Sequence, residues 1–232
     1  MSELKMKAKQ AAADAVVDMI KSGMAVGLGT GSTASLAIKA LGERVRREGL
    51  AVSAVATSFA SERLAAEHGL TLTTLDRTPE LDLAFDGADE VDPDLNLIKG
   101  RGAAHTREKI VASAAKRFVV LVDESKLVDR LGERMPLPVE VVPMAVEPVM
   151  SVLRRLGGEP ELRMGMKKDG PVVSDQGMWI VDAMFDVISD ADHVDRTLLT
   201  TPGVVDHGLF LGMATDVLVG LADGRVDVRT RD

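Results

Sequence analysis

The sequence of 232 residues contains no cysteine, which excludes disulfide bonds, thiolate metal sites and cysteine nucleophiles. Long apolar runs are also lacking, because no stretch approaches the roughly 18 residues that a membrane-spanning helix needs. The N-terminal stretch MSELKMKAKQAAADAVVDMI is charged and amphipathic and has no secretory apolar core. We therefore expect a cytoplasmic protein with no membrane partner.

Positive charge is scarcer than negative charge, with 28 Lys and Arg against 36 Asp and Glu and a formal net charge of −8. This balance argues against nucleic acid as a partner, although converging backbone N–H groups can bind an anion in an acidic protein. The chain is 46% hydrophobic and 28% charged, as is usual for a soluble globular protein. We expect its 12 methionines to fill the core rather than to form a binding surface.

The first half of the chain alternates helical and strand-like patterns. Helices are expected at 4–21, 33–49, 60–69 and 107–117, and strands at 24–29, 50–57, 81–85 and 118–124. Strands that alternate with helices form parallel βαβ units, so the fold class predicted is α/β with a doubly wound sheet. Ligands bind beyond the carboxyl ends of the strands in such sheets.

The pattern changes at the Met135–Pro138 segment and becomes a series of shorter pieces. Strand-like pieces follow at 139–143, 159–164, 170–175 and 178–186, with helical patterns at 147–156 and 192–199. We expect a smaller α+β domain at 132–207, and a larger domain made of 1–131 together with the strand-like tail 208–232.

Residues 27–34 read GLGTGSTA after a short apolar strand. Gly27, Gly29 and Gly31 do not have the spacing of a dinucleotide site, and no Gly-Lys-Ser/Thr follows as in a P-loop. A glycine turn at a helix N-terminus still presents free N–H groups to an anion, and hydroxyl side chains add donors. A single phosphate group fits this loop. The alternative is a tight turn capped by Ser or Thr, with no ligand.

Three further groups follow strand ends and therefore belong to the same sheet edge. Asp86 and Asp89 come after the strand 81–85, and Lys126 comes after the strand 118–124. Lys99 opens a second glycine turn, KGRG, which leads into a helix that carries Glu108. Carboxylates that transfer a proton and lysines that stabilise an enolate-like charge suit general acid–base catalysis on a small phosphorylated metabolite.

A metal site is not expected. Asp92, Asp94 and Asn96 match the first three ligand positions of a calcium-binding loop, but Leu97 replaces its required glycine and Ala103 its terminal glutamate. The sequence also has no metal triad, no dinucleotide motif and no Ser-His-Asp arrangement.

Six segments of the chain, in the order in which they occur, resemble type A ribose-5-phosphate isomerase almost from end to end. They are GLGTGSTA, DGADEVD, LIKGRGAAHTREKIVA, VDESK, LPVEVVPMA and GVVDHGLF. The resemblance implies a Rossmann-like α/β domain with a small α+β lid. It implies the interconversion of D-ribose 5-phosphate and D-ribulose 5-phosphate in the pentose phosphate pathway, without metal or cofactor, by a homodimer or homotetramer.

The resemblance also implies the site residues. The family's phosphate loop corresponds to Thr30, Gly31, Ser32 and Thr33, with Lys9 as a further phosphate ligand. Its sugar-binding segment corresponds to Asp86, Gly87, Ala88 and Asp89, and the turn that follows corresponds to Lys99, Gly100, Arg101 and Gly102. A substrate-binding lysine of the family corresponds to Lys126. Asp86 would assist ring opening, and Glu108 would move a proton between C2 and C1 of a cis-enediolate. Lys99 would offset the oxyanion charge, with Asp89 orienting the hydroxyls.

The role of Arg101 stays open, His105 is expected to be a partly exposed spacer, and His207 is expected to be structural. Rival interpretations are a CoA transferase or sugar-phosphate deaminase of related fold, and a sugar-phosphate-sensing module without turnover. A CoA transferase needs a pantetheine site, which nothing in the sequence indicates. A sensing module would have no need of Lys99 and Glu108 together.

Overall fold

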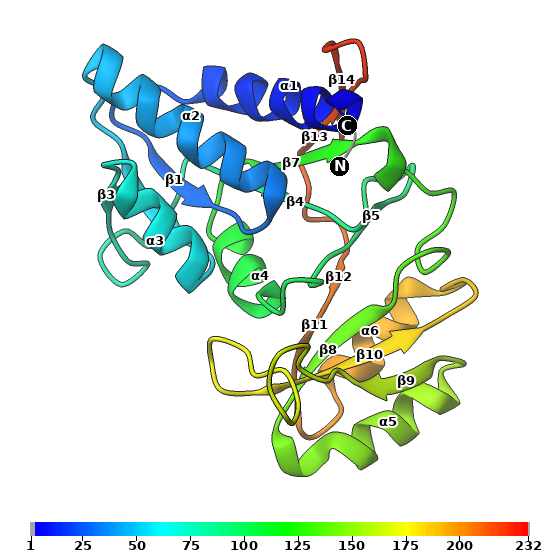
Figure 1. Ribbon diagram of the computed structural model, residues 1–232. Coiled ribbons are helices and arrows are strands. Elements are labelled where there is room, and N and C mark those ends of the chain that lie inside the picture. The colour runs from blue at the N-terminus through cyan, green and yellow to red at the C-terminus, as the bar shows by residue number, and fades with distance from the viewer. Residues whose placement is uncertain (1–2, 232) are drawn as a thin grey trace. The chain divides into compact units, whose positions relative to one another are not determined.

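The computed structural model describes residues 3–231, and these fall into two compact units (Figure 1). Unit 1 comprises the described residues up to Ala88, residues 107–127 and residues 213–231. Unit 2 comprises Asp89–Thr106 and Val128–Gly212. The expected domains differ from these units at 89–106, 128–131 and 208–212, which were expected in the larger domain. Residues 1, 2 and 232 of that domain lie outside the described part.

Unit 1 is built on a seven-stranded sheet with the order β14-β13-β7-β4-β1-β2-β3. Its strands are β1 (Ala25–Leu28), β2 (Ser53–Ala56), β3 (Thr71–Leu72), β4 (Leu83–Gly87), β7 (Phe118–Asp123), β13 (Asp216–Gly220) and β14 (Val226–Thr230). All neighbours are parallel except β13 and β14. The chain proceeds from β1 to β2 and β3 and then returns to β4 on the other side of β1. The β1–β4 boundary is thus a topological switch point, where ligands bind in such sheets.

Helices cover both faces of this sheet. They are α1 (Glu3–Met19), α2 (Ser32–Glu48), α3 (Phe59–Glu67) and α4 (His105–Ser113), with a short 3₁₀ helix η1 (Glu124–Lys126) after β7. Val26 and Leu28 of β1 share a buried core with residues of α1 and α2, which run side by side (Figure 1). Gly27 faces the opposite way, because a Cβ there would lie 2.5 Å from Val111 of α4. The predicted doubly wound α/β architecture is confirmed.

Unit 2 contains an antiparallel sheet with the order β11-β8-β10-β9. Its elements are β8 (Leu137–Val141), η2 (Pro143–Ala145), α5 (Val146–Arg155), β9 (Glu159–Leu162), β10 (Trp179–Met184), α6 (Ala191–Leu199) and β11 (Val204–His207). Val149 of α5 and Leu198 of α6 share a buried core with Val139 and Val181 of the sheet. The strand expected at 170–175 is wrong, since only isolated bridges from Pro171 and Val173 form there.

A three-stranded sheet, β12-β6-β5, completes unit 2 and was not predicted. Its strands β5 (Glu90–Val91), β6 (Leu97–Ile98) and β12 (Leu209–Phe210) have two residues each, too few to show a periodic pattern. The Lys99 N–H donates to the carbonyl of Gly208 at 2.9 Å, and the Val128 N–H donates to that of Val91 at 3.0 Å. These bonds explain why residues 89–106, 128–131 and 208–212 belong to unit 2.

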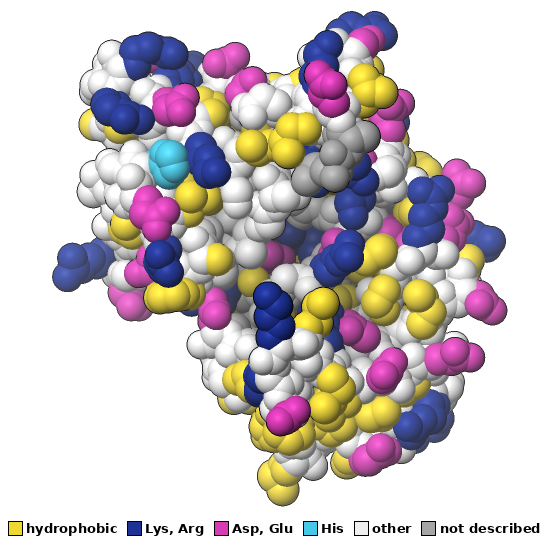
Figure 2. All heavy atoms as spheres, in the orientation of Figure 1, with side chains coloured by type: hydrophobic (Ala, Val, Ile, Leu, Met, Phe, Trp, Pro, Cys, Tyr) yellow, Lys and Arg dark blue, Asp and Glu magenta, His cyan; other side chains and the backbone are white. Residues whose placement is uncertain are grey.

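The surface in Figure 2 carries interspersed acidic and basic side chains. Methionine does not uniformly fill the core as expected: Met150 is buried, but Met144 and Met166 are 90% and 98% exposed. No helix between residues 3 and 231 is both long and apolar enough to cross a membrane.

Candidate active site

The GLGTGSTA segment forms the turn from β1 into α2. A Cβ at Gly29 would collide with the Asp86 carboxylate, so only glycine fits this approach. Gly31 has φ 109 and is the N-cap of α2, with no capping side chain among the described residues. The alternative of a Ser- or Thr-capped turn is therefore not what forms. The first N–H groups of α2 have no intrahelical partners, and with the helix dipole they favour an anion.

Asp86 stands at the switch point beside this turn. It is 2% exposed, and its Oδ1 accepts hydrogen bonds from the N–H groups of Thr30 at 2.9 Å and Gly87 at 2.7 Å. The parallel pairing of Leu28 with Phe85 brings the ends of β1 and β4 together. One carboxylate oxygen is thereby held beside the turn by two backbone donors.

The Thr30 hydroxyl ties the same turn to the end of β2. It lies 2.8 Å from the Thr57 hydroxyl and 2.7 Å from that of Ser58. Thr57 in turn donates its N–H to the carbonyl of Leu28 at 3.0 Å, and Ser58 caps α3. Hydrogen bonds therefore connect the carboxyl ends of three adjacent strands at the predicted phosphate loop.

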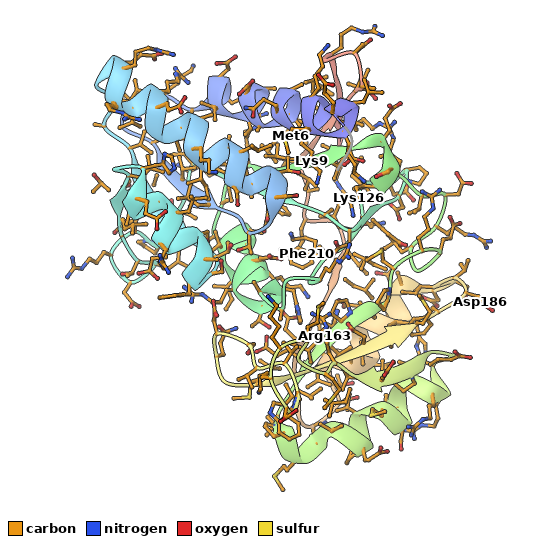
Figure 3. All side chains as sticks on the ribbon, in the orientation of Figure 1. Met6, Lys9, Lys126, Arg163, Asp186 and Phe210 are labelled. Carbon is orange, nitrogen blue, oxygen red and sulfur yellow. The ribbon has the colours of Figure 1, made fainter. Side chains whose placement is uncertain are left out.

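One predicted lysine contacts this loop from another element, and a second lies near it. Lys9 Nζ of α1 donates to the Ser32 hydroxyl at 2.8 Å, and Figure 3 shows Lys9 near Lys126 of η1. Burial lowers the pKa of Lys9; Asp123 opposes this shift, and Lys5 and Lys126 reinforce it. The Lys9 ammonium thus lies at the N-terminus of α2, where positive charge favours an anion.

Glu108 lies in the first turn of α4, as expected, because that helix begins at His105. The carboxyl is buried, with the residue 5% exposed. The dipole at this end of a helix favours the ionised form of a carboxyl group, whereas burial opposes it. Ionisation is the state that a proton acceptor requires.

The KGRG turn belongs to unit 2. Lys99 is 3% exposed, and its Nζ lies 5.4 Å from the centre of the Phe210 ring. Gly100 has φ 109, and the Arg101 N–H donates to Oδ2 of Asp89 at 3.0 Å. The turn thus joins a buried ammonium and a carboxylate within one unit.

The expectation that His105 is a partly exposed spacer is wrong, because its side chain is fully buried. A Cβ at Gly100 would lie 2.7 Å from His105 Nδ1, so the imidazole packs directly beneath the KGRG turn. His207 is also fully buried, with Nε2 3.4 Å from Asp195, in keeping with a structural role.

The predicted site residues are divided between the units. Unit 1 holds Lys9, Thr30, Gly31, Ser32, Thr33, Asp86, Gly87, Ala88, Glu108 and Lys126, and unit 2 holds Asp89, Lys99, Gly100, Arg101 and Gly102. Within the described range, no group of three or more His, Asp or Glu side chains has a metal-binding arrangement.

Two buried glutamates of unit 2 were not predicted from the sequence. Glu90 accepts from the N–H groups of Gly132, Arg134 and Met135, each at 2.7 Å. Glu140 is fully buried on β8 and accepts from the hydroxyls of Thr106 and Ser174. A glutamate inside the apolar run VEVV was an available signal for Glu140. Glu90 gave none, because it stands in an acidic segment.

Comparisons with known proteins point to one family. The family model described as ribose 5-phosphate isomerase A (phosphoriboisomerase A) matches residues 53–224. Ribose-5-phosphate isomerase A of Thermosynechococcus vestitus is 55% identical, over 95% of this chain and 94% of its own. The protein of the same name from Methanosarcina acetivorans is 52% identical, over 96% and 94%.

Solved structures of the same family also resemble this chain. Ribose 5-phosphate isomerase A of Methanocaldococcus jannaschii aligns with a TM-score of 0.93 and 46% identity, over 97% of this chain and 99% of its own. A D-ribose-5-phosphate isomerase in complex with phospho-erythronic acid aligns with a TM-score of 0.95 and 45% identity, over 100% of both chains. These relatives favour catalysis over a sensing module. The chain belongs to the ribose 5-phosphate isomerase A family.

Proposed function

We propose that this chain interconverts D-ribose 5-phosphate and D-ribulose 5-phosphate by general acid–base catalysis through a cis-enediolate. The observation that carries the proposal is the hydrogen bond from the Thr30 N–H to Asp86 Oδ1, which holds a buried carboxylate beside the glycine turn that leads into α2. A relative of 45% identity has been solved with phospho-erythronic acid, a phosphorylated sugar acid. A ligand of that class has an anion for such a turn and hydroxyls for neighbouring carboxylates.

The substrate phosphate is assigned to the turn from β1 into α2. Gly31, Ser32 and Thr33 supply backbone donors at the N-terminus of α2, where the dipole favours negative charge. Lys9, through its contact with Ser32, and Lys126 supply positive charge. This binding energy comes from a part of the substrate that does not react, and it orients the reacting carbons.

Proton transfer is assigned to two carboxylates of unit 1. Asp86 would exchange a proton with the ring oxygen or the C1 hydroxyl while the furanose opens. Glu108 would then take the proton from C2 of the open aldose and return it to C1. A proton passes from the O2 hydroxyl to O1 in the same interval, so the ketose forms with no net oxidation and no external reductant.

Charge stabilisation is assigned to unit 2. Removing the C2 proton leaves negative charge on the enediolate oxygens, and the Lys99 ammonium would offset it. Asp89, whose Oδ2 accepts from the Arg101 N–H, would orient the substrate hydroxyls, with Gly87, Ala88, Gly100 and Gly102 lining the sugar. We further propose that the enzyme is a cytoplasmic homodimer or homotetramer that acts without a cofactor.

The test is the conversion of ribose 5-phosphate to ribulose 5-phosphate in EDTA by wild type and Asp86→Asn. We expect metal-independent turnover that falls by about 10² or more in Asp86→Asn, the loss expected for a proton-transfer group. The matched control is Asp82→Asn, since Asp82 precedes the same strand but pairs with Lys116 at 3.0 Å. Binding of the sugar phosphate by wild type without turnover would favour the sensing module instead.

A further inference from the structure

Arg163 of unit 2, labelled in Figure 3, contacts the KGRG turn. Its Nη1 donates to the backbone carbonyls of Gly100 at 3.2 Å and Arg101 at 3.0 Å. Gly100 directly follows Lys99, and Arg101 is the residue whose N–H donates to Asp89 Oδ2. One guanidinium group therefore bonds the backbone that follows Lys99 and that donates a hydrogen bond to Asp89.

Asp182 holds Arg163 in this orientation. Arg163 Nε donates to Asp182 Oδ2 at 2.6 Å, and Nη2 donates to the other carboxylate oxygen. The two side chains are 17% and 23% exposed, so solvent screens the pair only partly. Asp182 is central in β10, paired with Pro138 on one side and Glu161 on the other. The bidentate pair thus connects the turn to a rigid sheet.

The backbone is strained at Ala103, directly after the turn. Ala103 has φ 57, a left-handed conformation that disfavours a side chain, whereas Gly100 adopts its φ of 109 without strain. Within the turn, one hydrogen bond from the Ala103 N–H to the Gly100 carbonyl closes the loop at 3.0 Å. Strained backbone persists where the surroundings over-determine it, and Arg163 supplies two such contacts.

We propose that Arg163, anchored by Asp182, is a positioning residue that orients the KGRG turn and through it the Lys99 ammonium and the Asp89 carboxylate. The inference rests on the proposed isomerase function. Only arginine fits the task, because a planar fork can bond a carboxylate bidentately and reach two carbonyls at once. A lysine ammonium keeps the charge but lacks this geometry.

The test compares wild type with Arg163→Lys in the conversion of ribose 5-phosphate, with inorganic phosphate as a competitive inhibitor. We expect kcat to fall by about 10–100-fold, the effect of misplacing a catalytic group by about an ångström. The inhibition constant of inorganic phosphate should not change, because the phosphate-loop residues all belong to unit 1. A general structural defect would change both kcat and the inhibition constant of inorganic phosphate, not kcat alone.

Arg117→Lys is the matched control. Arg117 also pairs bidentately with an aspartate, Asp216, at 2.8 and 3.3 Å, but it bonds no predicted site residue. An unchanged kcat in Arg163→Lys, or an equal fall in Arg117→Lys, would overturn the inference. If wild type were inactive, the proposed function itself would fail; an active wild type with an unaffected Arg163→Lys refutes only the positioning role.

Asp182→Asn provides a second variant that keeps the shape of the side chain. We expect its kcat to fall in the same direction, and the double variant Arg163→Lys/Asp182→Asn to be no slower than Arg163→Lys alone. Residues that act as one unit show such non-additivity. Strictly multiplicative losses would contradict the proposal.

Discussion

Thr30 and Asp86 share a hydrogen bond of 2.9 Å across the boundary between β1 and β4. The bond joins the turn assigned to phosphate with the carboxylate assigned to ring opening, so neither can move without the other. Gly29 makes this approach possible, because a side chain there would occupy the position of the carboxylate.

Gly29→Ala should therefore abolish most activity. The added methyl group must displace Asp86, at a cost of about 1–3 kcal/mol in the free energy of unfolding, the range for overpacking. We expect kcat to fall by at least about 10², the effect of a displaced catalytic group. Thermal melting and steady-state kinetics measure the two effects.

Gly49→Ala is the control for this prediction. Gly49 caps α2 in a left-handed conformation with φ 67, and a Cβ there meets nothing within 4 Å. It should cost about 1 kcal/mol of stability through backbone strain and leave kcat unchanged. Equal kinetic losses in both variants would show that stability alone, not the position of Asp86, controls activity.

The lowered pKa of Lys9 should make substrate binding depend on pH. Burial lowers its pKa, so in the free enzyme the positive charge is lost at a lower pH than for an ordinary lysine. KM for ribose 5-phosphate should rise with pH before the normal lysine range is reached. Folding disfavours the charged form of Lys9, and this lowers the free energy of unfolding at every pH below the folded-state pKa of Lys9. The free energy of unfolding then rises as pH increases from that pKa to the ordinary lysine pKa.

Lys9→Arg should remove the alkaline rise in KM, because a guanidinium stays charged throughout. Lys21→Arg, at an exposed lysine after α1, is the matched substitution and should leave the rise intact. An alkaline rise that survives in Lys9→Arg would exclude Lys9 as its source.

Phe210 should support the ammonium of Lys99. The Lys99 Nζ lies 5.4 Å from the centre of the buried Phe210 ring, within reach of a cation–π interaction. Phe210→Leu should lower kcat by between about 2- and 30-fold, corresponding to about 0.5–2 kcal/mol for such an interaction. Kinetics at saturating substrate measure this loss.

Phe185→Leu separates that effect from a loss of core packing. Phe185 is 5% exposed and packs in the core of unit 2 against Gly158. Both variants should lower the melting temperature, but only Phe210→Leu should lower kcat. If Phe185→Leu lowers kcat as much, the ring of Phe210 acts through packing alone.

The sequence predicted the parts of the site that depend on local patterns. Gly31 before a helical pattern predicted the glycine turn into α2, which the structure confirms, while the binding of an anion there stays a prediction. The alternation of strands and helices predicted Asp86 at the end of a strand beside that turn, where the structure has it. The position of Glu108 in the first turn of α4 followed in the same way. Such features depend on residues close together in the chain, which one sequence displays.

Features that depend on distant residues were not predicted. The two-residue strands of the β12-β6-β5 sheet form only because residues 209–210 meet residues 97–98, and no periodicity marks them. His105 was expected to be partly exposed, but the KGRG turn covers it. Arg163 acts 62 residues from Arg101, and no sequence signal connects the two.

The most direct test of the proposed mechanism follows the C2 hydrogen of ribose 5-phosphate in wild type and Glu108→Gln. With substrate deuterated at C2, wild type should deliver the label to C1 of ribulose 5-phosphate or to water. Glu108→Gln should still bind the sugar phosphate but lose both turnover and label transfer by about 10² or more. Transfer of the label at the wild-type rate in Glu108→Gln would contradict the account, because another group would then be the base.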